Sequence, residues 1–135
     1  MWDRTDYELS ELASSIAGHD VKVIFTDDLP GADGIAEYDR IFINRNAPFT
    51  KTAFIFWHEL SHIMLGHCHR HTDKRYKTSL HRYNREQPTQ SIQWRGYNTA
   101  EQPIESAADT LTLSLVSKHQ PAQLRNVQFY ISQRG

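Results

Sequence analysis

The chain has little cysteine and no long apolar run. Cys68 is its single cysteine, which excludes an internal disulfide and any zinc or iron–sulfur site built from four cysteines. No stretch reaches the roughly 18 consecutive apolar residues that suggest a membrane-spanning helix. Residues 1–6 are polar and acidic, unlike the basic and then apolar start of a secretory signal. We therefore expect a cytoplasmic protein with no membrane contact, whose function does not depend on thiol chemistry.

The composition that remains is typical of one globular domain. The 135 residues are 39% hydrophobic and 23% charged, which is enough apolar material for a core and too much for a disordered chain. This length predicts a single domain over residues 1–135. The net charge of −1 conceals an asymmetry: residues 1–39 carry ten of the sixteen acids, and residues 69–96 carry seven of the fifteen bases.

Hydrophobic periodicity in the first third of the chain predicts one helix and a small sheet. Apolar residues at helical spacing indicate an amphipathic helix over residues 6–17. A β-branched run predicts a strand over residues 21–25. Two further runs, 35–38 and 40–44, predict a tight hairpin that turns at Asp39. We expect a mostly antiparallel sheet.

The rest of the chain is predicted to be helical around a long polar connection. Residues 52–66 are apolar nearly all round, which predicts a central, buried helix, with Thr50 or Thr52 as its N-cap and Gly66 as its stop. Helices are also expected over 104–118 and from Pro121 to Ile131. The fold class is therefore α+β.

Residues 68–100 between these helices are polar, basic and without clear periodicity, so they predict a long loop. The bases within 70–95 alternate with aromatic residues. Such a pattern can follow a nucleic-acid backbone or an acidic protein partner, although a charged loop is more often simply solvated.

Two histidines and a glutamate fall within the five residues His58-Glu59-Leu60-Ser61-His62. On a helix, histidines at i and i+4 share a face and can bind one zinc ion. Glu59 is offset around the helix axis, where its carboxylate can take a proton from a zinc-bound water and return it to a leaving amine. The pattern predicts Zn²⁺ as cofactor, or another divalent ion in its place, and a metallopeptidase activity.

A catalytic zinc ion needs a third protein ligand and a free position. The longer metzincin motif is excluded because Leu65 and Cys68 occupy the positions of its glycine and histidine. Glu105 on the next predicted helix is the candidate third ligand, with Glu101 as the fallback. Asp109, one turn further on, can accept a hydrogen bond from a ligand histidine.

These motifs resemble the ImmA/IrrE family of small zinc metallopeptidases, on the gluzincin side of the zincins. The resemblance runs through Gly34–Asn44, through Phe56–His67 and through Glu105–Leu115. It implies a zincin-like fold in which His58, His62 and Glu105 bind zinc and Glu59 is the general base. It also implies a protein substrate, because the family typically cleaves helix-turn-helix repressors and some relatives belong to toxin–antitoxin pairs.

Two departures and two open points accompany the resemblance. The family usually has Asn followed by an aromatic-Ala pair where this chain has Asp109-Thr110-Leu111-Thr112, and the basic connection is longer than usual.

In a zincin, the strand before the metal helix would be a sheet edge that pairs with an extended substrate, which assigns this role to Ile41, Phe42 and Ile43. Tyr38, Tyr97 and His119 are candidates for stabilising the oxyanion.

An alternative function belongs to a different class. In it, the domain is a metal-stabilised binding module or toxin–antitoxin component that engages a partner or nucleic acid through residues 70–95, with slow hydrolysis or none. Glu59 argues against this alternative, because a site that only binds metal has no chemical need of an acid between the two histidines.

Overall fold

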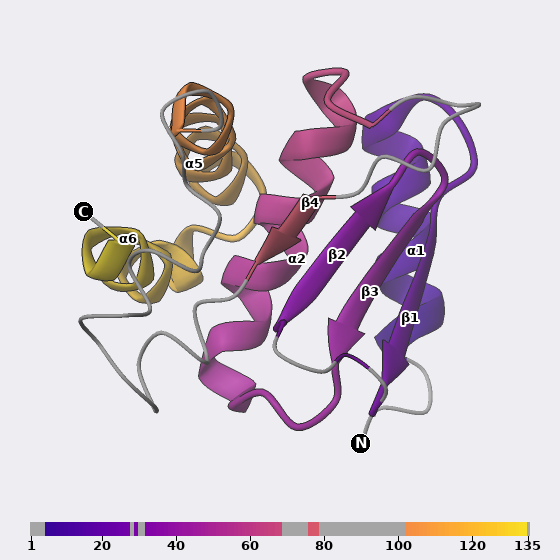
Figure 1. The fold of residues 1–135 in the computed structure, drawn as a ribbon, viewed down its shortest axis with the longest axis horizontal. Helices are drawn as coiled ribbons and strands as arrows, with labels where there is room; N and C mark the ends of the chain where they lie inside the picture. Colours follow the sequence, from indigo (N-terminus) through magenta and orange to yellow (C-terminus); the bar gives the residue numbers. More distant parts are fainter. Residues whose placement is uncertain (1–4, 28, 30–31, 69–75, 79–101, 135) are drawn as a thin grey trace.

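The structure, a computed structural model, describes residues 5–27, 29, 32–68, 76–78 and 102–134. It confirms the α+β class: a small sheet is covered on one face by helices, and a buried helix runs between the sheet and the C-terminal helices (Figure 1).

The sheet has four strands in the order β1-β3-β2-β4. β2 (Gly34–Glu37) and β3 (Arg40–Asn44) form the predicted hairpin, and β2 also pairs antiparallel with β4 (Tyr76–Thr78). β1 (Lys22–Thr26) pairs with β3 in parallel. The sheet is therefore antiparallel except at this pair.

The prediction that Ile41, Phe42 and Ile43 form a substrate-binding edge is wrong. These residues lie in β3, which is paired on both sides, with Phe42 opposite Ile24 of β1 and opposite Ile35 of β2. A strand whose backbone groups are used on both sides cannot add a further peptide. The edge strands among the described residues are β1 and β4.

β4 also corrects the expected loop over residues 68–100, because residues 76–78 are a strand within it. The edge of β2 would otherwise leave a row of backbone groups without sheet partners, and β4 pairs with it from Gly34 to Ala36. The remaining basic and aromatic positions of this stretch, in 70–75 and 82–95, lie outside the described residues.

The first helix, α1 (Thr5–Ala17), matches its prediction and ends at Gly18, whose φ of 82° is readily adopted by glycine. α1 packs against β1 and against α2. Ala13 is fully buried in this contact.

The central helix, α2 (Phe49–Met64), starts earlier than predicted. Pro48 is its N-cap, with an extended ψ of 140°, and no side chain caps the helix. Thr50 and Thr52 therefore lie inside α2, which makes the N-cap prediction wrong. Thr52 Oγ1 is 3.4 Å from the carbonyl oxygen of Pro48, and Thr50 Oγ1 is 3.2 Å from the hydroxyl of Tyr130.

α2 is central and buried, as predicted. It packs against β2 and β3 on one side and against α5 (Gln102–His119) and α6 (Leu124–Arg134) on the other, with a short 3-10 helix, η1 (Pro121–Gln123), between those two (Figure 1). Its fully buried apolar side chains include Phe54, Trp57 and Leu60. Within the part of the chain that the structure describes, no helix combines the length and the apolar character required to cross a membrane.

Candidate metal centre

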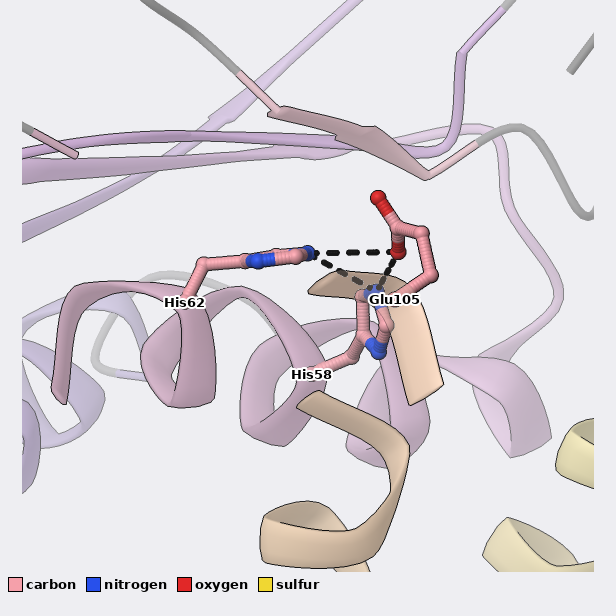
Figure 2. Close-up of side chains that lie close together, drawn as sticks. All are labelled: His58, His62 and Glu105. Carbon is pink, nitrogen blue, oxygen red and sulfur yellow. Dashed lines mark hydrogen bonds and ion pairs between the residues drawn. The ribbon is translucent and has the colours of Figure 1, made fainter. Parts of the chain in front are cut away.

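His58 and His62 lie one turn apart on α2 and project to the same side of the helix (Figure 2). Their Nε2 atoms are 3.2 Å apart and their rings are nearly perpendicular, at 88°. Both side chains are completely buried. Two basic nitrogen atoms that face each other inside a protein favour a shared partner between them.

Glu105, in the first turn of α5, brings a carboxylate to the same point. Its Oε1 is 2.9 Å from His58 Nε2 and 3.3 Å from His62 Nε2, so the three atoms form a small triangle (Figure 2). Among the described residues, these three are the group of metal-binding side chains whose donor atoms converge. The structure thus brings together the three residues that the sequence assigned as ligands.

Small side chains at the crossing of α2 and α5 allow this approach. Ser61, Ala108 and Thr112 are all fully buried where the helices meet. The hydroxyls of Ser61 and Thr112 are 3.0 Å apart, and each also lies 2.7 Å from the carbonyl oxygen four residues earlier in its own helix, that of Trp57 or of Ala108. Because each hydroxyl has one proton, one of the two donates to the carbonyl of its own helix and the other donates across the contact between the helices.

The triangle fits a metal ion in size. With zinc–nitrogen and zinc–oxygen bonds of about 2.0 to 2.1 Å, the donors of a tetrahedral site are about 3.3 Å apart. The observed separations of 2.9, 3.2 and 3.3 Å are close to that value. Two imidazoles and one carboxylate also form a donor set that zinc accepts.

The protonation states fit as well. Burial lowers the pKa of His62 to about 4, against the opposing hydrogen bond to Glu105. Burial by itself would raise the pKa of Glu105, but hydrogen bonds and charge interactions with His58 and His62 outweigh it and lower that pKa to about 2. At neutral pH the site therefore contains a neutral His62 and an ionised Glu105, the forms in which these groups bind metal.

Asp109 lies behind His58, where the sequence placed it. Its Oδ1 is 3.0 Å from His58 Nδ1, the ring nitrogen that faces away from the triangle. A carboxylate in this position orients a ligand imidazole and increases its basicity.

Glu59 is also fully buried, and the start of β2 shapes its surroundings. A Cβ atom added to Gly34 would lie 3.0 Å from Glu59 Oε2 and 2.6 Å from Ile55 Cγ2, so a side chain at position 34 would collide with α2. The buried ion pair between Asp33 and Lys51, at 3.0 Å, ties this end of β2 to the first turns of α2. Gly34 thus leaves the space in which the Glu59 side chain lies.

Sequence reasoning missed several of these residues. Gly34 appeared only as the first residue of the segment Gly34–Asn44, and Ser61 and Thr112 carried no signal beyond their small size. His67 appeared only as the last residue of the segment Phe56–His67, and its Nδ1 lies 2.9 Å from His62 Nδ1. Its position directly after the Gly66 helix stop was a usable signal.

The remaining candidates lie apart from the triangle or outside the described residues. Glu101 and Tyr97 belong to the undescribed part of the chain. His119 is fourteen residues along α5 from Glu105, or about 21 Å at 1.5 Å per residue, and it stacks on Trp57. This distance excludes the oxyanion role predicted for His119. Tyr38 stacks on His19, with ring centroids 4.2 Å apart.

Comparisons with models of protein families, with curated proteins and with solved structures find no match to this chain.

Proposed function

We propose that this protein is a zinc-dependent endopeptidase that cleaves a protein partner. The observation that carries the proposal is the convergence of His58 Nε2, His62 Nε2 and Glu105 Oε1 within 3.3 Å of one another, from two helices, at a buried point. Groups of this kind are costly to bury without a partner that uses their lone pairs.

The number of donors favours catalysis over a structural role. Structural zinc sites are usually closed by four protein ligands, whereas catalytic sites combine three with an open position. His58, His62 and Glu105 supply three. A zinc ion bound there supplies Lewis acidity, which makes water more acidic and polarises a carbonyl group.

In this proposal, side chains around the metal ion transfer the proton and hold the ligands in position. Glu59, on the same helix and buried beside Gly34, takes a proton from the attacking water and delivers it to the amine that leaves. Asp109 holds His58 in the orientation that directs Nε2 at the metal. Ser61 and Thr112 keep α5 close enough for Glu105 to reach it.

The proposed partner is a helix-turn-helix repressor or an antitoxin. Support for this part comes from the resemblance of Gly34–Asn44, Phe56–His67 and Glu105–Leu115 to the ImmA/IrrE family. In that family, the genes of the protease and of the repressor are typically neighbours. The protein encoded beside this gene is therefore the substrate to test first.

The experiment combines metal analysis with a cleavage assay. We expect the purified protein to contain stoichiometric zinc and to cut the neighbouring gene product at a defined site. The Glu59→Gln variant should keep the zinc and lose the cleavage, whereas Ser15→Ala, an exposed change on α1, should alter neither. Cleavage at the same rate by Glu59→Gln or by chelator-treated protein would contradict the proposal and point to a contaminating protease.

A second outcome would favour the alternative function. If the zinc-loaded protein bound its partner, or shifted DNA in a gel, without cutting any protein, a binding module would explain the result better. A gel shift with steep salt dependence that is lost when Lys74, Arg75 and Lys77 are replaced by serine would assign the contact to residues 70–95.

A further inference from the structure

We infer that His67 is a positioning residue for the metal ligand His62. Its Nδ1 accepts a hydrogen bond from His62 Nδ1–H and so holds the His62 ring with Nε2 directed at the metal. The inference rests on the proposed metal site and extends it to a residue outside the ligand set. The two Nδ1 atoms are 2.9 Å apart.

The end of α2 places His67 there. Gly66 has a φ of 76°, and its N–H donates to the carbonyl oxygen of Ile63 at 3.1 Å. The N–H of His67 donates to the carbonyl oxygen of His62 itself, at 2.9 Å. This pair of bonds is a Schellman motif, which reverses the chain after the last turn of a helix. The same turn that ends α2 therefore returns the His67 side chain to His62.

The tautomers follow from which nitrogen faces the metal. His62 Nε2 faces His58 and Glu105 (Figure 2), so its lone pair is the one available to a metal ion. A neutral imidazole that uses the lone pair of Nε2 carries its proton on Nδ1. His62 Nδ1 must then donate, which makes His67 Nδ1 the acceptor and places the His67 proton on Nε2.

The two ligand histidines are thus supported in different ways. His58 Nδ1 faces a carboxylate, Asp109, at 3.0 Å, whereas His62 Nδ1 faces an imidazole. Ligand histidines nearly always have a partner on the second nitrogen, and its loss typically weakens metal binding about 10 to 100-fold. We expect His67 to contribute within that range, and less than Asp109, because its acceptor is neutral.

The test compares two replacements of nearly the same size. In His67→Asn, a side-chain oxygen occupies the position of Nδ1 and can still accept the hydrogen bond; in His67→Leu, a methyl group occupies it. His67 is only partly buried, so both variants should fold. Zinc affinity, measured by competition with a chromophoric chelator, should fall about 10-fold or more in His67→Leu and by much less in His67→Asn.

The metal-loaded proteins supply readouts that do not depend on activity. Long-range ¹H–¹⁵N spectra of the zinc-loaded protein should show His67 as the Nε2–H tautomer. Cobalt(II) bound in place of zinc should have a changed visible spectrum in His67→Leu and a nearly normal one in His67→Asn. Unfolding of the two metal-free variants should show equal stability, which separates positioning from a general effect on folding.

The opposite results would overturn the inference. Equal zinc affinity in the two variants and the unchanged protein would show that His67 does not support His62. Loss of zinc from both variants as complete as in His62→Ala would make His67 a ligand. Failure of the metal site as a whole is distinguishable, because His58→Ala and Glu105→Ala would then leave the zinc content unchanged.

Discussion

Two junctions of this fold place helix side chains against polar groups of a neighbouring element, and they differ in what those side chains do. Where α2 meets α5, ionisable side chains converge on one buried point. Where α1 meets the edge of β1, Ser10 and Ser14 bond to strand backbone: Ser10 Oγ accepts from Val23 N–H at 2.8 Å, and Ser14 Oγ accepts from Val21 N–H at 2.8 Å. The first junction assembles the candidate metal ligands, and the second pairs backbone groups at the edge of the sheet.

The groove that accompanies one of these junctions is not where the metal-binding side chains of the described residues converge. A groove of about 670 Å³ lies along α1 and β1, lined among others by Tyr7, Ser10 and Lys22. At the α2–α5 junction, the side chains of His58, His62 and Thr112 are fully buried. Convergent donors with matched protonation states, rather than volume, are therefore our criterion for the candidate functional site. Changes at the two junctions should therefore have separate effects.

The largest expected effect is loss of the metal. Replacing Glu105 by alanine removes one corner of the triangle and leaves His58 and His62 facing each other without a shared carboxylate. We expect elemental analysis to find no stoichiometric zinc in Glu105→Ala, while Glu59→Gln retains it. Full zinc in Glu105→Ala would contradict the ligand assignment and turn attention to Glu101.

The next effect should follow from filling the space beside Glu59. A methyl group in Gly34→Ala would collide with Ile55 and displace the Glu59 carboxylate. A shift of about 1 Å in a catalytic group can reduce the rate about 10²-fold, whereas the three atoms nearest to the added methyl group belong to Ile55 and Glu59 and not to the proposed ligands. We expect cleavage to fall by roughly that factor at unchanged zinc content.

Two variants separate this effect from a loss of stability. The change Ala36→Gly, in the same strand, removes a buried methyl group without adding an atom beside Glu59, so it should reduce stability while preserving the cleavage rate. The double variant Gly34→Ala, Ile55→Ala removes the collision with Ile55 and keeps the one with Glu59, so its activity should stay low. Recovery of full activity in the double variant would show that Ile55 alone causes the defect.

Acid should destabilise the metal-free protein. The pKa of His62 is about 4 in the folded protein and 6.5 in an ordinary histidine, so the unfolded chain binds more protons between these values, and the free energy of unfolding falls as the pH drops through them. The same sign holds for Glu105, with a pKa of about 2 against 4.5, at lower pH. Between pH 7 and 4.5 the His62 contribution amounts to about 2 to 3 kcal/mol.

Urea unfolding at the two pH values, in the presence of chelator, measures this change. The His62→Asn variant lacks the titrating group and should show a loss smaller by about that amount. If acidification left the difference in stability between the two proteins constant, the site would not bury a neutral His62.

The sequence predicted those parts of the fold and site that depend on neighbouring residues. Gly18 and Gly66 ended their helices because only a residue tolerant of positive φ suits those turns. His58 and His62 follow from the helical repeat alone. Strand order is different: β3 became an inner strand through its parallel pairing with β1, and neither strand's own residues specify that partner.

The site divides in the same way. Glu105 and Asp109 were predicted from their spacing on one helix, Glu105 as the third ligand and Asp109, one turn further on, as the partner of a ligand histidine. The contact of Gly34 with Glu59 and the hydroxyl pair of Ser61 and Thr112 depend on how closely α2 approaches β2 and α5. Such approaches result from packing across long stretches of chain, which periodicity does not report.

The smallest expected effect lies at the closed sheet edge. Ser14 Oγ both accepts from the Val21 N–H and donates to the Val21 carbonyl oxygen at 3.1 Å. Because Val21 is buried, Ser14→Ala leaves two of its backbone groups without this partner. Losing such a partner reduces stability by about 1 to 2 kcal/mol. Ser15, next to it on α1, is exposed, and Ser15→Ala should change the free energy of unfolding by less than about 0.5 kcal/mol.

Neither variant should alter zinc affinity, because α1 touches α2 but contributes no side chain to the triangle. Denaturant unfolding and chelator competition on the same samples measure both quantities. A weaker zinc site in Ser14→Ala than in Ser15→Ala would show that the two junctions are coupled through α2, and the separation drawn between them would fail.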